Sequence, residues 1–346
     1  MATPFDPDAP GLAGPESLFG LPHTTADARV VVIPVPFEAT ASYGRGTKDA
    51  PAAIAQASLQ VELNDLDTGE PWRAGIAQEP ADPRMAAWET EASRLALPIL
   101  ARGGPQTDAD RADCARVDAI LEAIHDYVAG RTRHWLDRGR IPAIVGGDHS
   151  VSFGAIRAAA ERHPGIGLLH IDAHADLRLA YEGFTWSHAS ILRNVHDRLP
   201  GVSSIVSVGL RDVSRAEAEL LENTDRITAF SDSEITWELA AGEPWQRLCG
   251  RMVRALPEKV WVTCDIDGLD PSLCPNTGTP VPGGLAWREM MLLLHELGER
   301  KHHIVGFDLV EVGAQRWDAV VGARLLYKLA GWALSTQPGA QSNEGR

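Results

Sequence analysis

The sequence predicts an α/β protein in three layers, with helices on both faces of a mostly parallel β-sheet. Short apolar runs, typical of strands buried on both faces, alternate with segments of helical periodicity from residue 141 to residue 335. Such alternation implies right-handed crossovers between parallel strands. The 346 residues suffice for one large sheet, and a composition of 44% hydrophobic and 23% charged residues is that of a globular protein.

The N-terminal part of the chain is expected to contain an arm, a strand and a helix. Residues 1–28 are rich in Pro, Gly and Asp, which predicts an extended arm. The apolar run 29–34 predicts the first strand of the sheet. A glycine-rich loop then leads into a helix that begins near Asp49 or Ala50, with Pro51 in its first turn.

The remaining elements follow from changes in hydrophobic periodicity. Residues 65–112 are polar and irregular, whereas apolar side chains at helical spacing predict a helix at 115–138. Further strands are predicted at 141–146, 166–171, 203–208, 226–230, 259–264 and 303–310. Further helices are predicted at 151–162, 214–223, 244–256, 286–299 and 317–335. No linker divides the chain, so we expect one domain at 29–336 and a flexible tail at 337–346.

Net charge and cysteine usage limit the partners and the cellular compartment that we expect for the protein. Asp and Glu number 47 against 32 Lys and Arg, a formal net charge of −15, which argues against the basic face that nucleic acid requires. The 4 cysteines are scattered without a CxxC pair, as in proteins of a reducing compartment. No stretch resembles a signal peptide or a membrane span. We therefore expect a soluble cytoplasmic protein with neither nucleic acid nor a membrane as partner.

Three polar clusters stand where predicted strands end. They are Gly146-Gly-Asp-His-Ser150, Asp172-Ala-His-Ala-Asp176 and Asp265-Ile-Asp-Gly-Leu-Asp-Pro271. Ligands bind at the carboxyl edge of an open parallel sheet, because the loops converge there. Clusters that are separate in the sequence are therefore expected to form one site.

The side chains of these clusters point to metal ions. In an extended segment Asp172 and His174 point the same way, as do Asp265 and Asp267. Several carboxylates in one pocket repel one another unless cations compensate their charge. Carboxylates and imidazoles without thiolates favour Mn²⁺ over structural zinc. Six such side chains are the complement of two metal ions: His149, Asp172, His174, Asp176, Asp265 and Asp267.

Each cluster taken alone has a simpler explanation. The DAHAD segment can be a capping or hydrogen-bonding site, and the Asp-Gly and Asp-Pro pairs of 265–271 can be turn chemistry. The GGDHS segment can form a strand-to-helix turn with its own cap. The occurrence of all three clusters at strand ends favours a metal site over three separate coincidences.

These segments resemble the three metal motifs of the arginase/agmatinase (ureohydrolase) family, in its agmatinase-like branch. The matching segments are GGDHS, DAHAD and CDIDGLDPS, and NTGTPVPGGL at 276–285 resembles the family's glycine-rich continuation. Weaker matches lie at 35–44, 208–211 and 306–311. The resemblance extends from about residue 30 to residue 335. It implies a three-layer α/β/α fold with about eight strands.

The resemblance implies two Mn²⁺ ions per subunit and no organic cofactor, with 29–336 as the ureohydrolase catalytic domain. Asp172 and Asp265 would bridge the two ions. One histidine and one further aspartate would complete each site, namely His149 with Asp176 and His174 with Asp267. Metal-bound hydroxide, held by Asp176, would attack a guanidinium carbon and release urea and an amine.

Two further residues take their roles from the resemblance. Glu311 matches the glutamate that anchors the guanidinium, for which a carboxylate is a suitable bidentate partner. His188 matches the loop histidine of proton transfer, a role that suits a side chain whose pKa lies near working pH. Judged without the family, Glu311 can be a salt-bridged acid and His188 a surface residue. The remaining histidines lack ligand spacing, and His170 is interpreted as a strand residue.

The expected substrate is a small cationic guanidino compound. Agmatine, cleaved to putrescine and urea as in polyamine biosynthesis, is preferred; arginine, guanidino acids and guanidine are the alternatives. In the loop 177–190, Arg178 favours a carboxylate on the substrate, whereas Glu182 favours an amine. The aromatic residues Phe184 and Trp186 either line a pocket for the substrate chain or only pack the loop.

Other functions on the same fold make different demands on the ligand set. A deacetylase would use one zinc ion and fewer ligands, and a non-catalytic regulatory subunit would have lost a ligand. The chain keeps all six ligands, which favours the hydrolase. The segment 313–318 departs from the family pattern of a proline followed by an acid, so the local wall of the substrate pocket is not predicted. The resemblance also implies a homo-oligomer.

Overall fold

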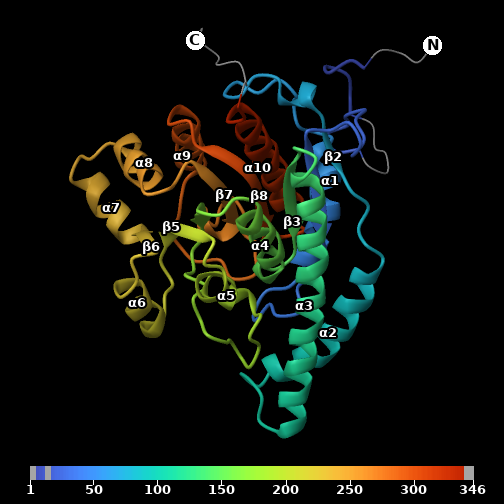
Figure 1. Cartoon of the computed structure of the whole chain (residues 1–346), viewed down its shortest axis with the longest axis vertical. Helices are drawn as coiled ribbons and strands as arrows, with labels where there is room; N and C mark the ends of the chain where they lie inside the picture. Colours follow the sequence, from blue (N-terminus) through green and yellow to red (C-terminus); the bar gives the residue numbers. More distant parts are fainter. Residues whose placement is uncertain (1–4, 12–16, 339–346) are drawn as a thin grey trace.

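The computed structural model describes residues 5–11 and 17–338, which fold into a three-layer α/β/α domain (Figure 1). The eight strands of its sheet follow the order β2-β1-β3-β8-β7-β4-β5-β6, and all neighbouring strands are parallel. The predicted fold class is therefore confirmed. The strands are β1 (Val30–Val35), β2 (Ile76–Gln78), β3 (Ile141–Gly146), β4 (Ile166–Ile171), β5 (Val202–Leu210), β6 (Ile227–Ser231), β7 (Lys259–Asp265) and β8 (His303–Val310).

Helices cover both faces of the sheet, because alternate side chains of a strand point to opposite sides. In β1, Val30 and Val32 belong to one buried cluster, whereas Val31 and Ile33 belong to the other. The helices are α1 (Ala50–Ser58), α2 (Arg84–Leu100), α3 (Asp108–Leu136), α4 (Phe153–Arg162), α5 (Ile191–Arg198), α6 (Arg215–Glu222), α7 (Asp232–Ala240), α8 (Trp245–Arg254), α9 (Trp287–Glu299) and α10 (Arg316–Ser335). Helices α1, α8, α9 and α10 contribute to the first cluster, and α2 to α5 contribute to the second.

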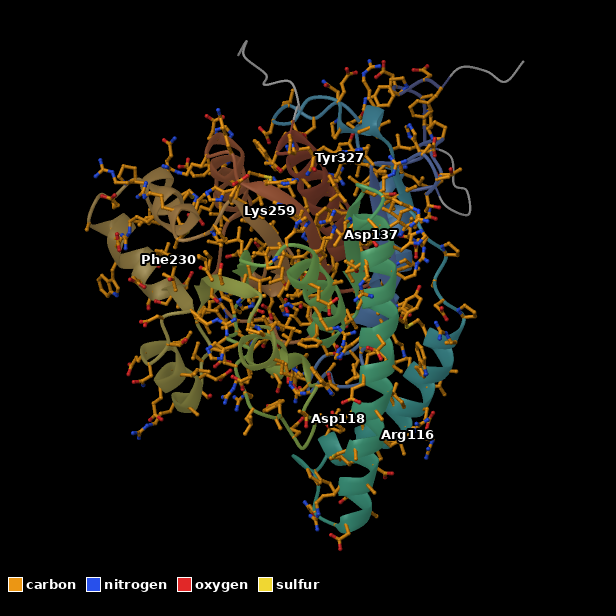
Figure 2. All side chains as sticks on the ribbon, viewed as in Figure 1. Arg116, Asp118, Asp137, Phe230, Lys259 and Tyr327 are labelled. Carbon is orange, nitrogen blue, oxygen red and sulfur yellow. The ribbon has the colours of Figure 1, made fainter. Side chains whose placement is uncertain are left out.

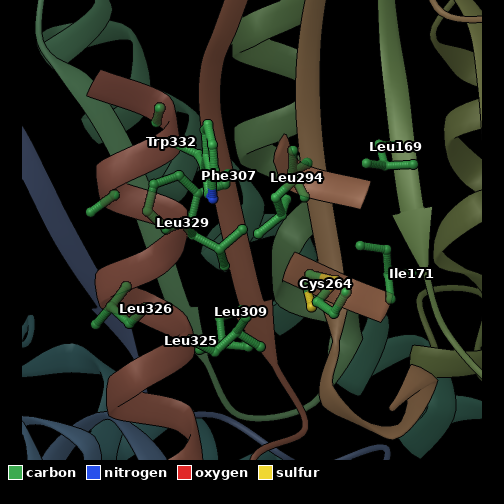
Figure 3. Close-up of a cluster of buried hydrophobic side chains, with 14 of the residues drawn as sticks. Leu169, Ile171, Cys264, Leu294, Phe307, Leu309, Leu325, Leu326, Leu329 and Trp332 are labelled. Carbon is green, nitrogen blue, oxygen red and sulfur yellow. The ribbon is translucent and has the colours of Figure 1, made fainter. Parts of the chain in front are cut away.

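Figure 3 shows the first cluster where α10 packs against the sheet. Phe307 and Leu309 of β8 lie beside Leu325 and Leu329 of α10, and all four side chains are buried. Burial of each such side chain contributes about 1.5–3 kcal/mol. The central strands that lead to the polar clusters are therefore rigidly held.

The segment 65–112 contains regular structure, so the prediction of an irregular segment is wrong. Strand β2 pairs with β1 at the edge of the sheet, and α2 packs beside α3 (Figure 1). The buried side of α2 combines Leu95 and Ile99 with small alanines, and Pro98 stands in its last turn. The buried apolar residues from Met85 to Ile99 recur at helical spacing, so the periodicity of this segment was itself a signal of the helix.

Helix α3 begins earlier than predicted, at Asp108 instead of near residue 115. Thr107 and Asp110 form a capping box there, which satisfies N–H groups at the helix start. The first turns of α3 are largely exposed, so they carry no apolar signal. Helices α5 and α7 are short and were also not predicted. None of the described helices is both long and apolar enough to cross a membrane.

The described part of the N-terminal segment packs on the domain. The ring of Phe19 lies 4.7 Å from that of Tyr327, and the Phe19 N–H donates to Oγ of Ser58 at 2.8 Å. The predicted arm at 1–28 and tail at 337–346 are described only in part. The residues outside the described ranges are 1–4, 12–16 and 339–346.

Candidate metal centre and substrate cavity

The three polar clusters meet at the carboxyl edge of four neighbouring strands. Strands β3, β8, β7 and β4 lie side by side in the middle of the sheet. Each of them ends where a cluster, or Glu311, begins. Because the strands are parallel, all four ends lie at one edge. The structure thus brings together residues that are far apart in the sequence.

His149 begins the 3-10 helix η3 (His149–Ser152), and its ring is buried. Its Nδ1 atom lies 3.1 Å from Oδ2 of Asp176 and 3.2 Å from Oδ2 of Asp172. Oδ2 of Asp265 lies 3.6 Å from the same nitrogen. Nevertheless, this nitrogen has no hydrogen-bond partner among the described residues. A buried nitrogen that faces three carboxylates without a hydrogen bond is arranged as a ligand of a shared cation.

The two carboxylate oxygens of Asp172 face two different histidines, His149 and His174. Oδ2 faces Nδ1 of His149, whereas Oδ1 lies 3.5 Å from Nδ1 of His174. The same His174 nitrogen lies 3.2 Å from Oδ2 of Asp267. Asp172, His174 and Asp267 thus form a second group of donor atoms, all within 4.8 Å of one another. Asp172 is placed between two candidate cation positions.

Asp265 and Asp267 do not share one extended segment, contrary to the expectation. Asp265 ends β7, and Asp267 lies in the 3-10 helix η5 (Ile266–Gly268). The carboxylate of Asp265 accepts the N–H of Asp267 at 2.9 Å, which caps this turn. The turn brings Asp267 to His174, while Asp265 faces His149. The two aspartates therefore lie near different histidines, and of the two only Asp267 belongs to one of the compact donor groups among the described residues.

His170 belongs to the first donor group, with His149, Asp172 and Asp176. It lies in β4 two residues before Asp172, on the same side of the strand. Its Nε2 lies 2.9 Å from Oδ2 of Asp172, and its Nδ1 lies 3.0 Å from Oγ of Ser207. With both nitrogens engaged, His170 orients the Asp172 carboxylate. The spacing of two residues before Asp172 was the signal that could have found it.

A chain of buried polar groups supports the His149 ring at its Nε2 atom. Its Nε2 atom lies 2.9 Å from Oγ1 of Thr263. That hydroxyl donates to Oδ1 of Asp308 at 2.8 Å, and the indole N–H of Trp261 donates to the other oxygen at 2.6 Å. These bonds fix the ring orientation and leave Nδ1 directed at the carboxylates.

The electrostatics of the centre favour bound cations. Burial, together with the charges of Asp267 and Asp172, raises the pKa of Asp265 well above its usual value. Burial and the charge of Asp172 raise the pKa of Asp176 to about 6. Burial lowers the pKa of His174, but the carboxylates of Asp172 and Asp267 raise it to about 12. Protons thus compensate the carboxylates when no cation does, and bound metal ions would displace them.

Glu311 follows β8 in a left-handed backbone conformation, with φ 58°. Its Oε1 accepts the backbone N–H of His149 at 3.0 Å. Oε2 lies on the side of Gly278, where an added Cβ would be 3.3 Å away. Burial and the charges of Asp148 and Asp267 raise the pKa of Glu311 well above its usual value. A cationic ligand would restore its charged form.

A cavity of about 440 Å³ adjoins this centre, and His174, Asp176 and His188 all line it. His188 lies in the 3-10 helix η4 (His188–Ser190). Burial and the neighbouring His174 lower the pKa of His188 to about 4. Tyr181 also lines the cavity, with its ring edge-on to that of His188 at 6.1 Å. At neutral pH the cavity therefore presents a neutral imidazole beside the centre.

Phe184 and Trp186 do not line this cavity. Both are buried, and the indole of Trp186 packs 4.8 Å from the ring of His125 and 4.7 Å from that of Phe153. The indole N–H donates to Glu122 of α3 at 3.2 Å. Of the two interpretations of these aromatic residues, loop packing is therefore the one the structure supports.

Charged side chains of both signs line the cavity. The guanidinium of Arg178 stacks over Tyr181 at 4.6 Å and lies 3.9 Å from Glu217. Glu217 is buried and also accepts the N–H of Ser214 at 3.0 Å. Asp212, in contrast, keeps 71% of its side chain exposed, 4.0 Å from His174. The positive charge is thus engaged by the protein, whereas a carboxylate faces solvent.

Arg211, in the weak match at 208–211, joins the centre to the cavity wall. Its guanidinium donates to the backbone carbonyls of Asp267 at 2.5 Å and Val281 at 3.0 Å. A Cβ at Gly284 would lie 2.8 Å from this guanidinium, so the glycine leaves room for it. Residues 276–281 are the wall segment of the cavity, and Arg211 aligns this segment with the Asp267 turn.

A model of the arginase family matches residues 28–331. The chain belongs to the arginase family. The N(1)-aminopropylagmatine ureohydrolase of Thermus thermophilus is 34% identical to it, over 88% of this chain and 90% of that protein. The agmatinase of Bacillus subtilis is 31% identical, over 83% and 84%. The solved agmatine ureohydrolase of Thermoplasma volcanium superposes with a TM-score of 0.68 and 26% identity, over 89% and 91% of the two chains.

Membership of the arginase family gives the class of reaction. This arginase-family chain is a hydrolase that acts on guanidino C–N bonds, and its relatives are agmatinase-like ureohydrolases. The buried histidines and aspartates are compatible with the binuclear metal site of the family. The expectations of family, fold and enzyme class are therefore confirmed.

Asp318 ends the segment 313–318, which departs from the arginase-family pattern, and lies in the first turn of α10. Its carboxylate accepts the backbone N–H of Asn276 at 2.8 Å and the Sγ–H of Cys274 at 3.0 Å. A Cβ at Gly313 would lie 2.6 Å from the carbonyl oxygen of Asn276, so this close approach requires glycine. The wall segment, which continues to Thr279 in the cavity, is thus fixed to α10.

Proposed function

We propose that this arginase-family enzyme hydrolyses agmatine to putrescine and urea with two Mn²⁺ ions per subunit. The observation that carries the proposal is that His174 and Asp176 of the candidate centre share one cavity with His188. A guanidino group in this cavity would meet the metal-binding carboxylates and a proton-transfer group together. Such an arrangement supports hydrolysis at the guanidinium carbon.

The proposed ligand set fits manganese by its chemistry. Carboxylates and imidazoles without a thiolate are donors that suit Mn²⁺. When bound, the two ions supply a water of lowered pKa as nucleophile and offset the negative charge of the transition state. The proposed ligands are His149, Asp172, His174, Asp176, Asp265 and Asp267.

The chain's own residues would bind the substrate and move its protons. The Glu311 carboxylate would hold the guanidinium by paired hydrogen bonds. Asp176 would take the proton of the attacking water. His188, whose pKa is lowered to about 4 mainly by burial, is neutral at pH 7, so it would take this proton from Asp176 and pass it to the more basic departing amine. The hydroxyl proton on the attacked carbon would reach the amine in the same way as the C–N bond breaks. Water and the guanidinium would thus become urea and an ammonium ion.

The charges of the cavity favour a substrate whose distal end is an amine. Arg178 is stacked on Tyr181 beside Glu217, so its charge is already compensated. The exposed carboxylate of Asp212 is available for an ammonium group. These charges support agmatine over arginine and over guanidino acids, whose carboxylates would meet Asp212.

A second candidate substrate is N(1)-aminopropylagmatine, the compound named for the Thermus thermophilus relative. It carries a secondary amine where agmatine has its primary amine, and its added aminopropyl group would extend from the cavity toward solvent. The largely exposed Asp212 would then pair with one of its two amines. The two candidates differ in length, not in the chemistry of the reacting end.

Urea release from manganese-loaded protein tests the proposal. We expect kcat/KM for agmatine or N(1)-aminopropylagmatine to exceed the values for arginine, guanidinobutyrate and guanidine at least tenfold. Asp212→Asn should lower the value for agmatine and leave that for guanidine, which has no distal amine, unchanged. An arginine value tenfold above that of agmatine would overturn the substrate assignment. No urea from any compound would favour the regulatory subunit.

We further propose a cytoplasmic homo-oligomer with its catalytic domain at 29–336. The cysteines support a reducing compartment, since Cys114, Cys249, Cys264 and Cys274 are all buried free thiols. The family resemblance supports the oligomer. Light scattering of the purified protein at micromolar concentration tests it, and a monomer would contradict it.

A further inference from the structure

Thr40 connects two segments of the candidate centre. It lies in the loop after β1 and is fully buried. Its hydroxyl accepts the backbone N–H of His188 at 3.1 Å and donates to Oδ2 of Asp148 at 2.8 Å. The directions of these bonds are determined, because an N–H group can only donate and an ionised carboxylate can only accept.

Asp148 in turn holds the segment that carries His149. Its Oδ1 accepts the N–H of Ser150 at 3.1 Å and the hydroxyl of the same residue, which caps η3. Its Oδ2 accepts the backbone N–H of Thr40 at 3.2 Å as well as the Thr40 hydroxyl. One buried carboxylate therefore joins the metal segment to Thr40.

Close backbone contact keeps these two loops together. The N–H of Asp148 donates to the carbonyl of Phe37 at 2.9 Å. A Cβ at Gly147 would lie 2.0 Å from the same carbonyl oxygen, so only glycine permits the approach. The loop after β1 thus cannot move independently of the metal segment.

The loop around His188 has a separate anchor at an earlier point. Asp118 of α3 (Figure 2) accepts the backbone N–H groups of Thr185 at 3.2 Å and Trp186 at 3.1 Å. Thr40 acts further along the loop, at His188 itself. Loss of the Thr40 hydroxyl would therefore release the His188 backbone and leave the rest of the loop attached to α3.

We propose that Thr40 is a positioning residue that sets the distance between His188 and the metal segment. The inference rests on the proposed role of His188 in proton transfer. Proton transfer requires an approach within hydrogen-bond distance, and a displacement of about 1 Å costs roughly 100-fold in rate. Thr40 would thus act on turnover through His188, without contact with the substrate.

The test compares three variants with the parent protein. Thr40→Val keeps the shape of the side chain and removes both hydroxyl bonds, whereas Thr40→Ser keeps them. Thr132→Val in α3 is the matched control, because its hydroxyl is equally buried and has no hydrogen-bond partner among the described residues. If Thr40→Val does not fold, Thr40→Ala replaces it with the same expectation.

We expect Thr40→Val to lower kcat for the best substrate by roughly 10-fold to 100-fold. KM should stay within about threefold and both metal ions should remain bound, as measured by elemental analysis. Thr40→Ser and Thr132→Val should retain at least about one third of the parent's kcat. Hydrogen–deuterium exchange at the His188 amide should accelerate in Thr40→Val and in neither of the other two variants.

A double-mutant cycle shows whether Thr40 acts through His188. In a His188→Ala background, Thr40→Val should lower the residual kcat less than twofold. A full additional loss there, an unchanged kcat in Thr40→Val, or loss of metal ions would each overturn the inference. If the parent releases no urea from any tested compound, the proposed function fails, and amide exchange at His188 still decides whether Thr40 fixes its backbone.

Discussion

The carboxylate of Glu311 accepts a hydrogen bond from the backbone N–H of His149 at 3.0 Å, across 162 positions of the chain. The two residues follow β8 and β3, which are neighbours in the sheet. The bond occupies Oε1, while Oε2 lies on the side of Gly278. The proposed guanidinium anchor and a proposed metal ligand are therefore held as one unit on adjacent strands.

Glu311→Gln should abolish most activity and leave the metal centre intact. The amide oxygen can still accept the His149 N–H, but the charge that complements a guanidinium is lost. We expect kcat/KM to fall roughly 100-fold to 1,000-fold, with two metal ions per chain by elemental analysis. Glu299→Gln, an exposed site on α9, is the control. Activity like that of the parent would remove Glu311 from the proposed site.

Asp265→Asn should cost the protein both metal ions, because Asp265 is proposed to bridge them. An amide is a poorer ligand than a carboxylate and leaves the charge of the site less balanced. Metal content after gel filtration should fall from two ions per chain toward zero. Asp270→Asn, in the same polar cluster, should keep both ions. A single zinc ion in active parent protein would contradict the two-manganese proposal.

Asp318→Ala should loosen the wall segment that Asp318 holds. Without the carboxylate, the buried thiol of Cys274 and the partly buried N–H of Asn276 lose their partner. We expect the free energy of unfolding to fall by about 2–4 kcal/mol and KM to rise about tenfold, with metal content unchanged. Asp108→Ala, an exposed first-turn acid on α3, is the control. An unchanged KM would show that the cavity does not depend on this anchor.

His125 should make the protein less stable in mild acid. Burial lowers its pKa to about 4, from a usual value of 6.5 that applies to the unfolded chain. Between these values the unfolded state binds more protons, so stability is lost as the pH falls from 6.5 toward 4. Between pH 7.5 and pH 5.0 this residue alone removes about 2 kcal/mol.

Urea denaturation of His125→Gln at the two pH values checks this prediction. The free energy of unfolding of the variant should fall about 2 kcal/mol less than that of the parent. The glutamine amide can still donate to the carbonyl of Ser150, which His125 Nε2 approaches at 2.9 Å. An equal fall in both proteins would show that His125 is accessible to protons in the folded state.

Strong apolar runs made most of the sheet predictable. Strands buried on both faces appear as continuous apolar runs, and the predicted runs 141–146, 166–171 and 303–310 coincide with β3, β4 and β8. The bounds of the other predicted strands differ from the observed ones by one or two residues. Helix α2 was not predicted, although its buried apolar residues recur at helical spacing within the polar segment 65–112. His170 is interpreted from the sequence only as a strand residue, although its spacing of two residues before Asp172 places both side chains on the same side of the strand.

The sequence by itself determined the fold class, the polar clusters at strand ends and the six candidate metal ligands, because these follow from hydrophobic periodicity and from residue types at short spacing. Only the tertiary structure decided which distant residues meet. Strand order places Glu311 beside His149. A 3-10 turn places Asp265 and Asp267 near different histidines. The packing of two loops places Thr40 against His188. Such contacts depend on how strands are ordered and how loops pack, and local sequence patterns specify neither.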